Sequence, residues 1–211
     1  MKRFFSLLTA AAVLLSLSAC SQPARSTSPD EPAPAQGAAP ETDNTPAAEA
    51  ADASVLIAYF SWSGNTAEMA AQIQEQTGGD LFEIVPVEPY PTDYSECGDV
   101  ALAERDSNAR PEIQNLPESI EQYDTIFIGY PIWWHTAPMI IGTFLESYDL
   151  SGVDVYPFTQ SASMDTEQFD QSMDFVRQAA AGATVHDGLF VRASDTDGIT
   201  GYLTENGFPA A

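Results

Sequence analysis

Apolar runs alternate with amphipathic segments along residues 53–211. Residues 55–60 form a continuous, partly β-branched apolar run, which is typical of a strand buried on both faces of a parallel sheet. Residues 66–76 place apolar side chains at helical spacing among polar ones, and a glycine pair at 78–79 would end that helix. The pattern therefore predicts a strand, a short turn and a helix.

The same alternation continues to the end of the chain. Residues 80–87 alternate weakly, as an edge strand would, and prolines at 89 and 91 predict a loop over 88–96. Further strands are predicted at 125–130, 153–159 and 184–191, and further helices at about 96–108, from Pro138 to about 148, at 166–180 and at 195–205. The order predicts an α/β fold with a doubly wound, five-stranded parallel sheet. Strand order 2-1-3-4-5 would place a ligand beyond the carboxyl ends of strands 1 and 3.

The turn after the first strand is rich in hydroxyl and amide groups. Backbone N–H groups and the positive end of a helix dipole converge at such a turn and favour an anion. Residues 53–211 contain no lysine and no triphosphate-loop or dinucleotide glycine pattern, so a monophosphate is expected. An ordinary helix cap is the structural alternative. The residues of this turn are Ser61, Trp62, Ser63, Gly64, Asn65 and Thr66.

Two further loops stand out at the ends of predicted strands. The loop after the third strand has two adjacent tryptophans between two prolines, and it contains Pro131, Ile132, Trp133, Trp134 and His135. The loop after the fourth strand consists of small polar residues from Gln160 to Ser163. The alternative for each tryptophan is that it is an ordinary side chain of the hydrophobic core and not part of a binding site.

These loops resemble those of the flavodoxin-like family, and the similarity extends over residues 54–205. The resemblance rests on the sequences Tyr-Phe-Ser-Trp-Ser-Gly-Asn-Thr at 59–66 and Gly-Tyr-Pro-Ile-Trp-Trp-His-Thr-Ala-Pro at 129–138. It implies one noncovalently bound flavin mononucleotide (FMN) and transfer of electrons through it. The glycine that many flavodoxins have in the second loop is absent, as is the glycine pair common in the third.

The resemblance also implies a role for each loop. The phosphate would be held by Ser61, Ser63, Gly64, Asn65 and Thr66. The flavin ring would be bordered by Pro131, Ile132, Trp133 and Trp134, with Trp62 as a further stacking candidate, and on its other side by Thr159, Gln160, Ser161 and Ser163. His135 would lie at the rim of the ring, where it is a candidate proton donor.

Other chemistry has weaker support in the sequence. Ser63 lacks the glycine two places before it that a nucleophile elbow needs, and no cluster of metal ligands is present. His186 falls in the last predicted strand, where a structural role is expected. Cys97 is expected to be a buried, inert side chain.

The first 52 residues predict export. A short basic start and an apolar stretch over 4–17 end in Leu-Ser-Ala-Cys, which resembles the lipobox of bacterial lipoproteins. A signal peptide over 1–19 and lipid attachment at Cys20 are predicted, with an ordinary signal peptide as the alternative. Residues 20–52 are rich in alanine, proline and acidic residues and predict an extended linker. The folded domain would span residues 53–211 and lie outside the cytoplasmic membrane.

The net charge of the predicted domain indicates which kinds of partner it could bind. Residues 53–211 hold four arginines against 25 acidic residues, a net charge of −21. Such a surface repels nucleic acid and attracts basic partners, although solubility alone would also explain it. The sequence predicts an extracytoplasmic, lipid-anchored FMN electron carrier with a redox partner protein. The alternatives are an FMN-dependent reductase for NAD(P)H or quinones, and a binding module of this fold without flavin.

Overall fold

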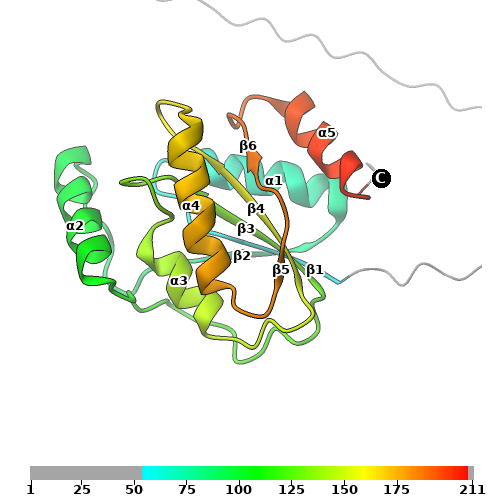
Figure 1. The fold of residues 1–211 in the computed structure, drawn as a ribbon, viewed down its shortest axis with the longest axis horizontal. Helices are drawn as coiled ribbons and strands as arrows, with labels where there is room; N and C mark the ends of the chain where they lie inside the picture. Colours follow the sequence, from blue (N-terminus) through cyan, green and yellow to red (C-terminus); the bar gives the residue numbers. More distant parts are fainter. Residues whose placement is uncertain (1–53, 209–211) are drawn as a thin grey trace, which may run out of the picture. The chain divides into compact units, whose positions relative to one another are not determined.

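The computed structural model describes residues 54–208, and the predicted signal peptide, Cys20 and the whole predicted linker lie outside this range. Its strands form one parallel sheet in the order β2-β1-β3-β4-β5, with β6 also paired to β4 (Figure 1). The strands are β1 Val55–Tyr59, β2 Asp80–Glu83, β3 Thr125–Pro131, β4 Asp154–Gln160, β5 Thr184–Val185 and β6 Leu189–Phe190. The helices are α1 Asn65–Thr77, α2 Tyr94–Ser107, α3 Met139–Glu146, α4 Thr166–Ala179 and α5 Thr196–Glu205. The predicted fold class and strand order are confirmed.

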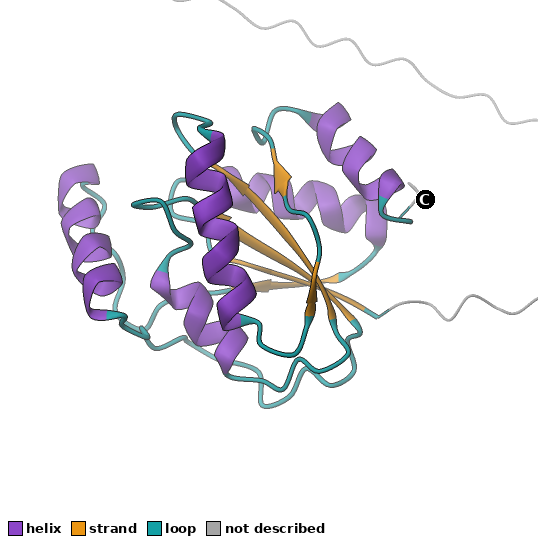
Figure 2. Ribbon diagram, in the orientation of Figure 1, coloured by secondary structure: helices purple, strands orange, loops and turns teal. Residues whose placement is uncertain are grey.

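Helices cover both faces of the sheet (Figure 2). One core joins alternate residues of β1, β3 and β4 to α3 and α4, for example Ile128 to Phe144. The other core joins the intervening residues to α1 and α5, for example Ile57 to Ile73. Because successive side chains of a strand point to opposite faces, an apolar strand supplies both cores at once.

The predicted second strand over 80–87 is too long. β2 ends at Glu83, and Pro86 pairs instead in an antiparallel bridge with Ile113. Hydrogen bonds on both sides of this bridge, from Val87 N–H to the Glu112 carbonyl (2.8 Å) and from Gln114 N–H to the Val85 carbonyl (2.7 Å), turn the chain away from β1. Proline cannot donate to a ladder, so it stands where parallel pairing ends.

The predicted fifth strand over 184–191 is divided in two. Both β5 and β6 pair with β4, but residues 186–188 between them form no ladder. The Asp187 carbonyl accepts a hydrogen bond from the Tyr202 hydroxyl of α5 at 2.6 Å, which directs this backbone segment toward the helix. The other predicted boundaries agree with the structure within two residues; α2 begins at Tyr94 because the Asp93 side chain accepts from the N–H groups of Ser95 and Glu96.

Close packing between β3 and β4 requires a glycine at position 129. A Cβ atom on Gly129 would lie 2.2 Å from Cζ of Phe158, whose ring is fully buried. The strand ends that carry the candidate loops are therefore fixed by tight side-chain packing. Within residues 54–208, no helix has the length and apolar character needed to span a membrane.

Candidate functional site

The turn between β1 and α1 presents a row of backbone donors. Gly64 has a φ of 90° and directly precedes α1, with no side-chain cap of its own. The Ser61 hydroxyl oxygen accepts from the Ala67 N–H at 3.2 Å, and the Gly64 carbonyl accepts from the Glu68 N–H at 3.0 Å. Among the described residues, the N–H groups of residues 63–66 have no acceptor.

Side chains complete this turn. The Asn65 amide donates to the Ser63 hydroxyl oxygen at 3.1 Å, and both residues are exposed together with Gly64. Thr66 is 2% exposed. Four free N–H groups at the positive end of a 13-residue helix, flanked by hydroxyl groups, are suited to an anion such as a phosphate. Ser61 does act on the helix start as a cap would, but it satisfies only one of the first N–H groups.

The tryptophan loop after β3 closes in a tight turn. Trp133 and Thr136 exchange two backbone hydrogen bonds of 3.0 Å each, and the residues between them, Trp134 and His135, have φ values of 49° and 64°. Positive φ at both central positions defines a type I′ turn, which normally contains asparagine and glycine. Trp134 is 46% exposed and His135 is exposed as well.

A cavity of about 530 Å³ lies between this turn, α2 and the loop after β4. Trp62 forms part of its wall and is held by a hydrogen bond from its indole N–H to the Pro91 carbonyl at 2.9 Å. Trp62 also makes edge-on contacts with Trp133 and Tyr94, at centroid distances of 6.4 and 6.3 Å. The cavity is lined by Trp62, Tyr94, Ser95, Cys97, Gly98, Asp99, Ala101, Ile132, Trp133, Trp134, His135, Ser161, Ala162, Ser163 and Gln168.

Of the four residues predicted to lie at the site in the loop after β4, only two line this cavity. Ser161, which is 7% exposed, accepts from the Met164 N–H at 2.9 Å and lines the cavity with Ser163. The Thr159 hydroxyl instead donates to the Tyr130 carbonyl, and Gln160 Oε1 accepts from the Ala193 N–H at 2.8 Å. Both of these side chains therefore serve the packing of the sheet and of the segment before α5.

The structure thus brings together seven of the predicted site residues around the cavity: Trp62, Ile132, Trp133, Trp134, His135, Ser161 and Ser163. The predicted phosphate residues, Ser61 and Ser63 to Thr66, lie in the adjoining turn rather than in the cavity wall. Pro131, Thr159 and Gln160 are not among the lining residues.

Comparison with known proteins identifies the family. A family model described as flavodoxin matches residues 54–205. The chain belongs to the flavodoxin family. A flavoprotein structure in complex with FMN from Lactobacillus acidophilus NCFM is 30% identical with a TM-score of 0.58, and the match covers 68% of this chain and 96% of that one. A candidate flavoprotein from Bacteroides eggerthii DSM 20697 is 33% identical with a TM-score of 0.64, covering 72% of this chain and 96% of that one. No curated protein matches the sequence significantly.

This flavodoxin has a cavity wall that the sequence analysis did not predict. Helix α2 contributes Tyr94, Ser95, Cys97, Gly98, Asp99 and Ala101, and α4 contributes Gln168. The signal for α2 was weak because the helix buries only Cys97 and Ala101 and has little apolar periodicity. Small residues at 97, 98 and 101, which share one side of a helix, were the available indication that this side leaves space.

Burial raises the pKa values of Tyr90, Cys97 and Glu104. The Tyr90 hydroxyl donates to Glu104 Oε2 at 2.8 Å, and burial raises the pKa of Tyr90 far above its ordinary value. Burial also raises the pKa of the Glu104 carboxyl, although the bond from Tyr90 acts in the opposite direction. Cys97 is 4% exposed, and burial followed by the nearby Glu104 raises the pKa of its thiol. The prediction of a buried Cys97 is confirmed.

His186 lies away from this site, at the opposite end of β4. Its Nε2 atom is 2.7 Å from Asp154 Oδ1, and its ring stacks on Tyr156 at a centroid distance of 4.1 Å. The residue is therefore engaged in packing and hydrogen bonding, as a structural histidine would be. Within residues 54–208, no group of three or more potential ligands is arranged to hold a metal ion.

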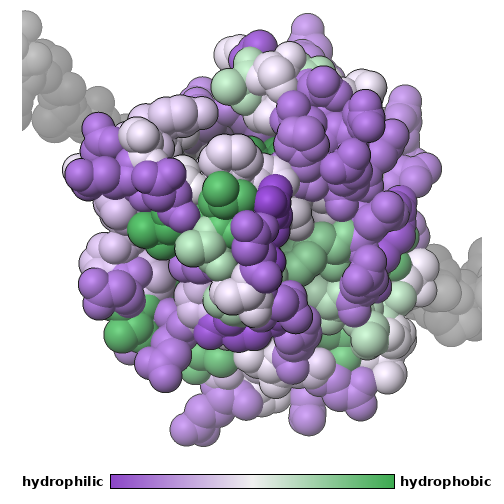
Figure 3. Space-filling view, turned by 60° about the vertical axis from the view of Figure 1, so that its left-hand side comes forward, coloured by the Kyte–Doolittle hydropathy of each residue, from purple (hydrophilic) through white to green (hydrophobic). Residues whose placement is uncertain are grey.

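Three of the four arginines within residues 54–208 form ion pairs. Arg105 pairs with Asp106 at 2.7 Å and Arg110 with Glu146 at 2.6 Å. Arg177 pairs with Asp174 at 3.4 Å. The face that includes α2 is mostly hydrophilic, with separate hydrophobic patches between the polar groups (Figure 3).

Proposed function

We propose that this flavodoxin binds one FMN molecule without covalent attachment and serves as an electron carrier outside the cytoplasmic membrane. The observation that best supports this function is the row of free N–H groups over residues 63–66 beside a cavity with aromatic walls. A phosphate ester of a planar aromatic molecule has the two parts that these two features would accept. FMN is such a molecule, and it is present in the Lactobacillus acidophilus relative.

The residues of this chain fit the two ends of FMN separately. Ser63, Gly64, Asn65 and Thr66 would donate backbone N–H groups to the phosphate, while the Ser61 hydroxyl keeps the first helical turn closed. Trp62 and Trp133 would give apolar contact to the ring, because aromatic faces and edges attract one another beyond simple burial. When bound, FMN supplies the capacity to accept and release electrons.

The protein residues would bind, orient and shield the cofactor. Trp62 cannot easily rotate because its indole N–H is engaged by Pro91. His135 is the rim residue predicted as a proton donor, and it lies on the cavity wall in an exposed turn. Ser161 is fixed by its bond from Met164, so the third loop offers a preformed surface.

We further propose that lipid at Cys20 anchors the protein to a bacterial membrane and that its redox partner is a basic protein. The lipobox-like sequence before Cys20 supports the anchor. The net charge of −21 over residues 53–211 supports a basic partner, because opposite charge accelerates encounter, and disfavours nucleic acid.

A reductase for NAD(P)H or quinones is the second candidate. The cavity of about 530 Å³ supports this candidate, because a space of that size beside α2 would admit a substrate next to the cofactor. Such an enzyme would oxidise NAD(P)H by itself, whereas a carrier needs partner proteins at both ends of its cycle.

Spectroscopy of the purified chain tests the proposal. A yellow protein, or a colourless one that takes up added FMN in a one-to-one ratio, is expected. Slow oxidation of NAD(P)H that accelerates only with a partner protein would favour the carrier, and rapid oxidation without a partner would favour the reductase. A chain that neither contains nor takes up FMN would contradict both and leave a flavin-free binding module.

A further inference from the structure

Helix α2 forms one side of the cavity but has few attachments to the rest of the fold. Six of its residues line the cavity, and only Cys97 and Ala101 are buried. Figure 1 shows α2 at the edge of the fold, to one side of the sheet. Its position must therefore depend strongly on a small number of specific contacts.

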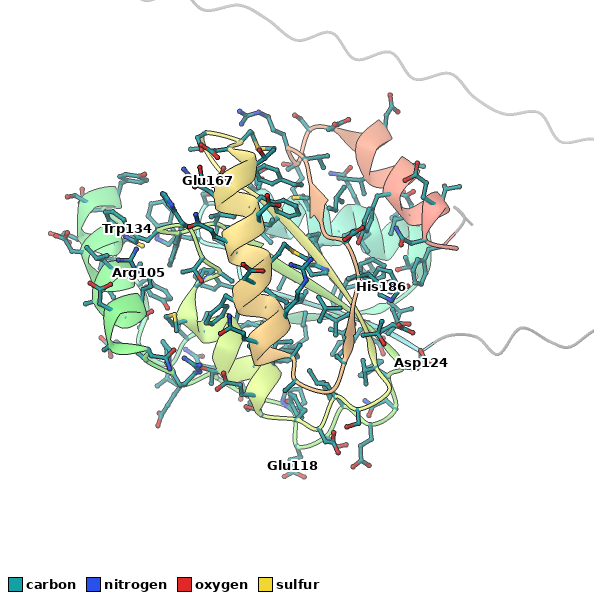
Figure 4. The ribbon with its side chains drawn as sticks, viewed as in Figure 1. Arg105, Glu118, Asp124, Trp134, Glu167 and His186 are labelled. Carbon is teal, nitrogen blue, oxygen red and sulfur yellow. The ribbon has the colours of Figure 1, made fainter. Side chains whose placement is uncertain are left out.

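Two of these contacts join α2 to the tryptophan turn in opposite directions. The Trp134 indole N–H donates to the Gly98 carbonyl at 2.8 Å, and Arg105 Nη1 donates to the Trp134 carbonyl at 3.2 Å. The Arg105 guanidinium carbon also lies 6.0 Å from the centre of the Trp134 ring. Figure 4 labels both residues and shows them next to each other beside α2.

Arg105 is itself oriented for this contact. Its Nε and Nη2 atoms both donate to Asp106 Oδ1, at 3.0 and 2.7 Å. Since the guanidinium is planar, fixing these two nitrogens also directs Nη1. The bond to the Trp134 carbonyl therefore comes from an arginine whose fork is already held on its other side.

The turn needs this support from outside. Trp134 and His135 have φ values of 49° and 64°, a backbone conformation that residues other than glycine seldom adopt. Such backbone persists where the surrounding structure holds it in place. Arg105 and Gly98 both belong to α2, so the shape of the turn and the position of α2 depend on each other.

We propose that Arg105 and Trp134 are positioning residues that hold α2 and the 133–136 turn together as the outer wall of the cavity. They thereby fix the width of the space available to a planar aromatic ligand and slow its escape. The ligand's identity as FMN rests on the proposed function, whereas the coupling between helix and turn does not.

Reactivity of the Cys97 thiol reports on this wall directly. The full chain contains two cysteines, so Cys20→Ser leaves Cys97 as the single thiol. In this background, Arg105→Met removes the donor at similar length, and Trp134→Phe keeps an aromatic ring but removes the indole N–H. Arg177→Met is the matched control, because Arg177 is an exposed arginine on α4. Arg105→Lys retains a cationic donor and tests rescue.

Two rates are measured: Cys97 labelling by a disulfide reagent, and FMN release after dilution. Arg105→Met should raise both rates about tenfold, because its hydrogen bond involves a charged group, and Trp134→Phe should raise both about threefold, because its hydrogen bond joins two neutral groups. Arg105→Lys should lie between Arg105→Met and the parent, and Arg177→Met should match the parent. Labelling should be independent of low urea concentrations, since local opening exposes little surface.

The outcomes separate the two proposals. Parental labelling in both variants, or labelling that rises only in step with urea-dependent global unfolding, would overturn the positioning role. If the parent chain takes up no FMN while both variants still expose Cys97, the positioning role stands and the proposed function fails. Raised labelling with an unchanged rate of FMN release would overturn the part of the proposal that links the wall to ligand retention.

Discussion

The Ser61 hydroxyl oxygen accepts a hydrogen bond from the backbone N–H of Ala67 at 3.2 Å, across the turn that joins β1 to α1. This contact closes the first turn of the helix while leaving the N–H groups of residues 63–66 without acceptors in the described part of the chain. Gly64, at φ 90°, permits the bend. The N–H groups proposed to bind the phosphate are therefore already grouped at one turn.

Loss of polar groups from this turn should weaken FMN binding. Thr66→Val keeps the shape of a side chain that is 2% exposed and removes its hydroxyl, and Asn65→Ala removes the amide that holds Ser63. Each change should cost about 1–3 kcal/mol of binding free energy if a charged hydrogen bond is lost. Titration of flavin fluorescence gives the Kd. Thr204→Val, on α5, is the matched control and should leave the Kd unchanged. Unaltered affinity in both site variants would move the phosphate elsewhere.

Gly129→Ala should destabilise the fold without touching the site. The new Cβ would lie 2.2 Å from Cζ of the buried Phe158 ring, and overpacking of this kind costs about 1–3 kcal/mol. Gly201→Ala, in α5, has no atom within 4 Å of its new Cβ and should add about 0.5–1 kcal/mol through helix propensity. Urea unfolding measures both changes. Equal stability of the two variants would contradict the packing described for β3 and β4.

Glu104→Gln should make the stability of the protein less dependent on pH. Burial raises the pKa of Glu104 above its ordinary value of 4.5, so the folded state binds this proton more tightly than the unfolded state does. The parent therefore loses stability as the pH rises from the ordinary value through the raised one. Glutamine does not titrate and can still accept from Tyr90.

The advantage of Glu104→Gln over the parent should consequently be greater at pH 7 than near pH 4, as measured by urea unfolding at the two pH values. Glu118→Gln removes one exposed charge and serves as the control for the change in net charge. An advantage that is the same at both pH values would show that Glu104 titrates alike in the folded and unfolded states.

Cys20→Ser should release the protein from membranes. If lipid is attached to the Cys20 thiol, serine removes the attachment point, and centrifugation of cell fractions should move most of the protein into the soluble fraction. A variant that still sediments with membranes would contradict the lipid anchor while leaving the flavin site untouched.

The apolar pattern of the chain was sufficient to predict the sheet because each core strand, such as 55–60, is buried on both faces. The pattern was insufficient for the edge strands of the sheet, because single tertiary contacts determine where those strands end. The last strand is divided where the Tyr202 hydroxyl donates a hydrogen bond to the Asp187 carbonyl. The parallel pairing of β2 ends before Pro86, which pairs with Ile113 instead. Neither partner can be read from local periodicity.

The candidate site follows the same division. The turn over residues 61–66 and the tryptophan loop could be predicted because parallel strands bring their carboxyl ends to one edge. The contribution of α2 could not, since it arises from the side of a helix whose buried residues number only two. Likewise, Gln160 was predicted to border the flavin ring, but its side-chain oxygen accepts a hydrogen bond from the N–H of Ala193, 33 residues later in the chain.

The ratio of the Kd values for riboflavin and FMN tests the central claim most directly, because the two molecules differ only by the phosphate. If the N–H groups of residues 63–66 hold the phosphate, the purified chain should bind FMN at least about 100-fold more tightly than riboflavin, corresponding to two or more charge-assisted hydrogen bonds. Equal affinity for the two flavins, or no binding of either, would contradict the account.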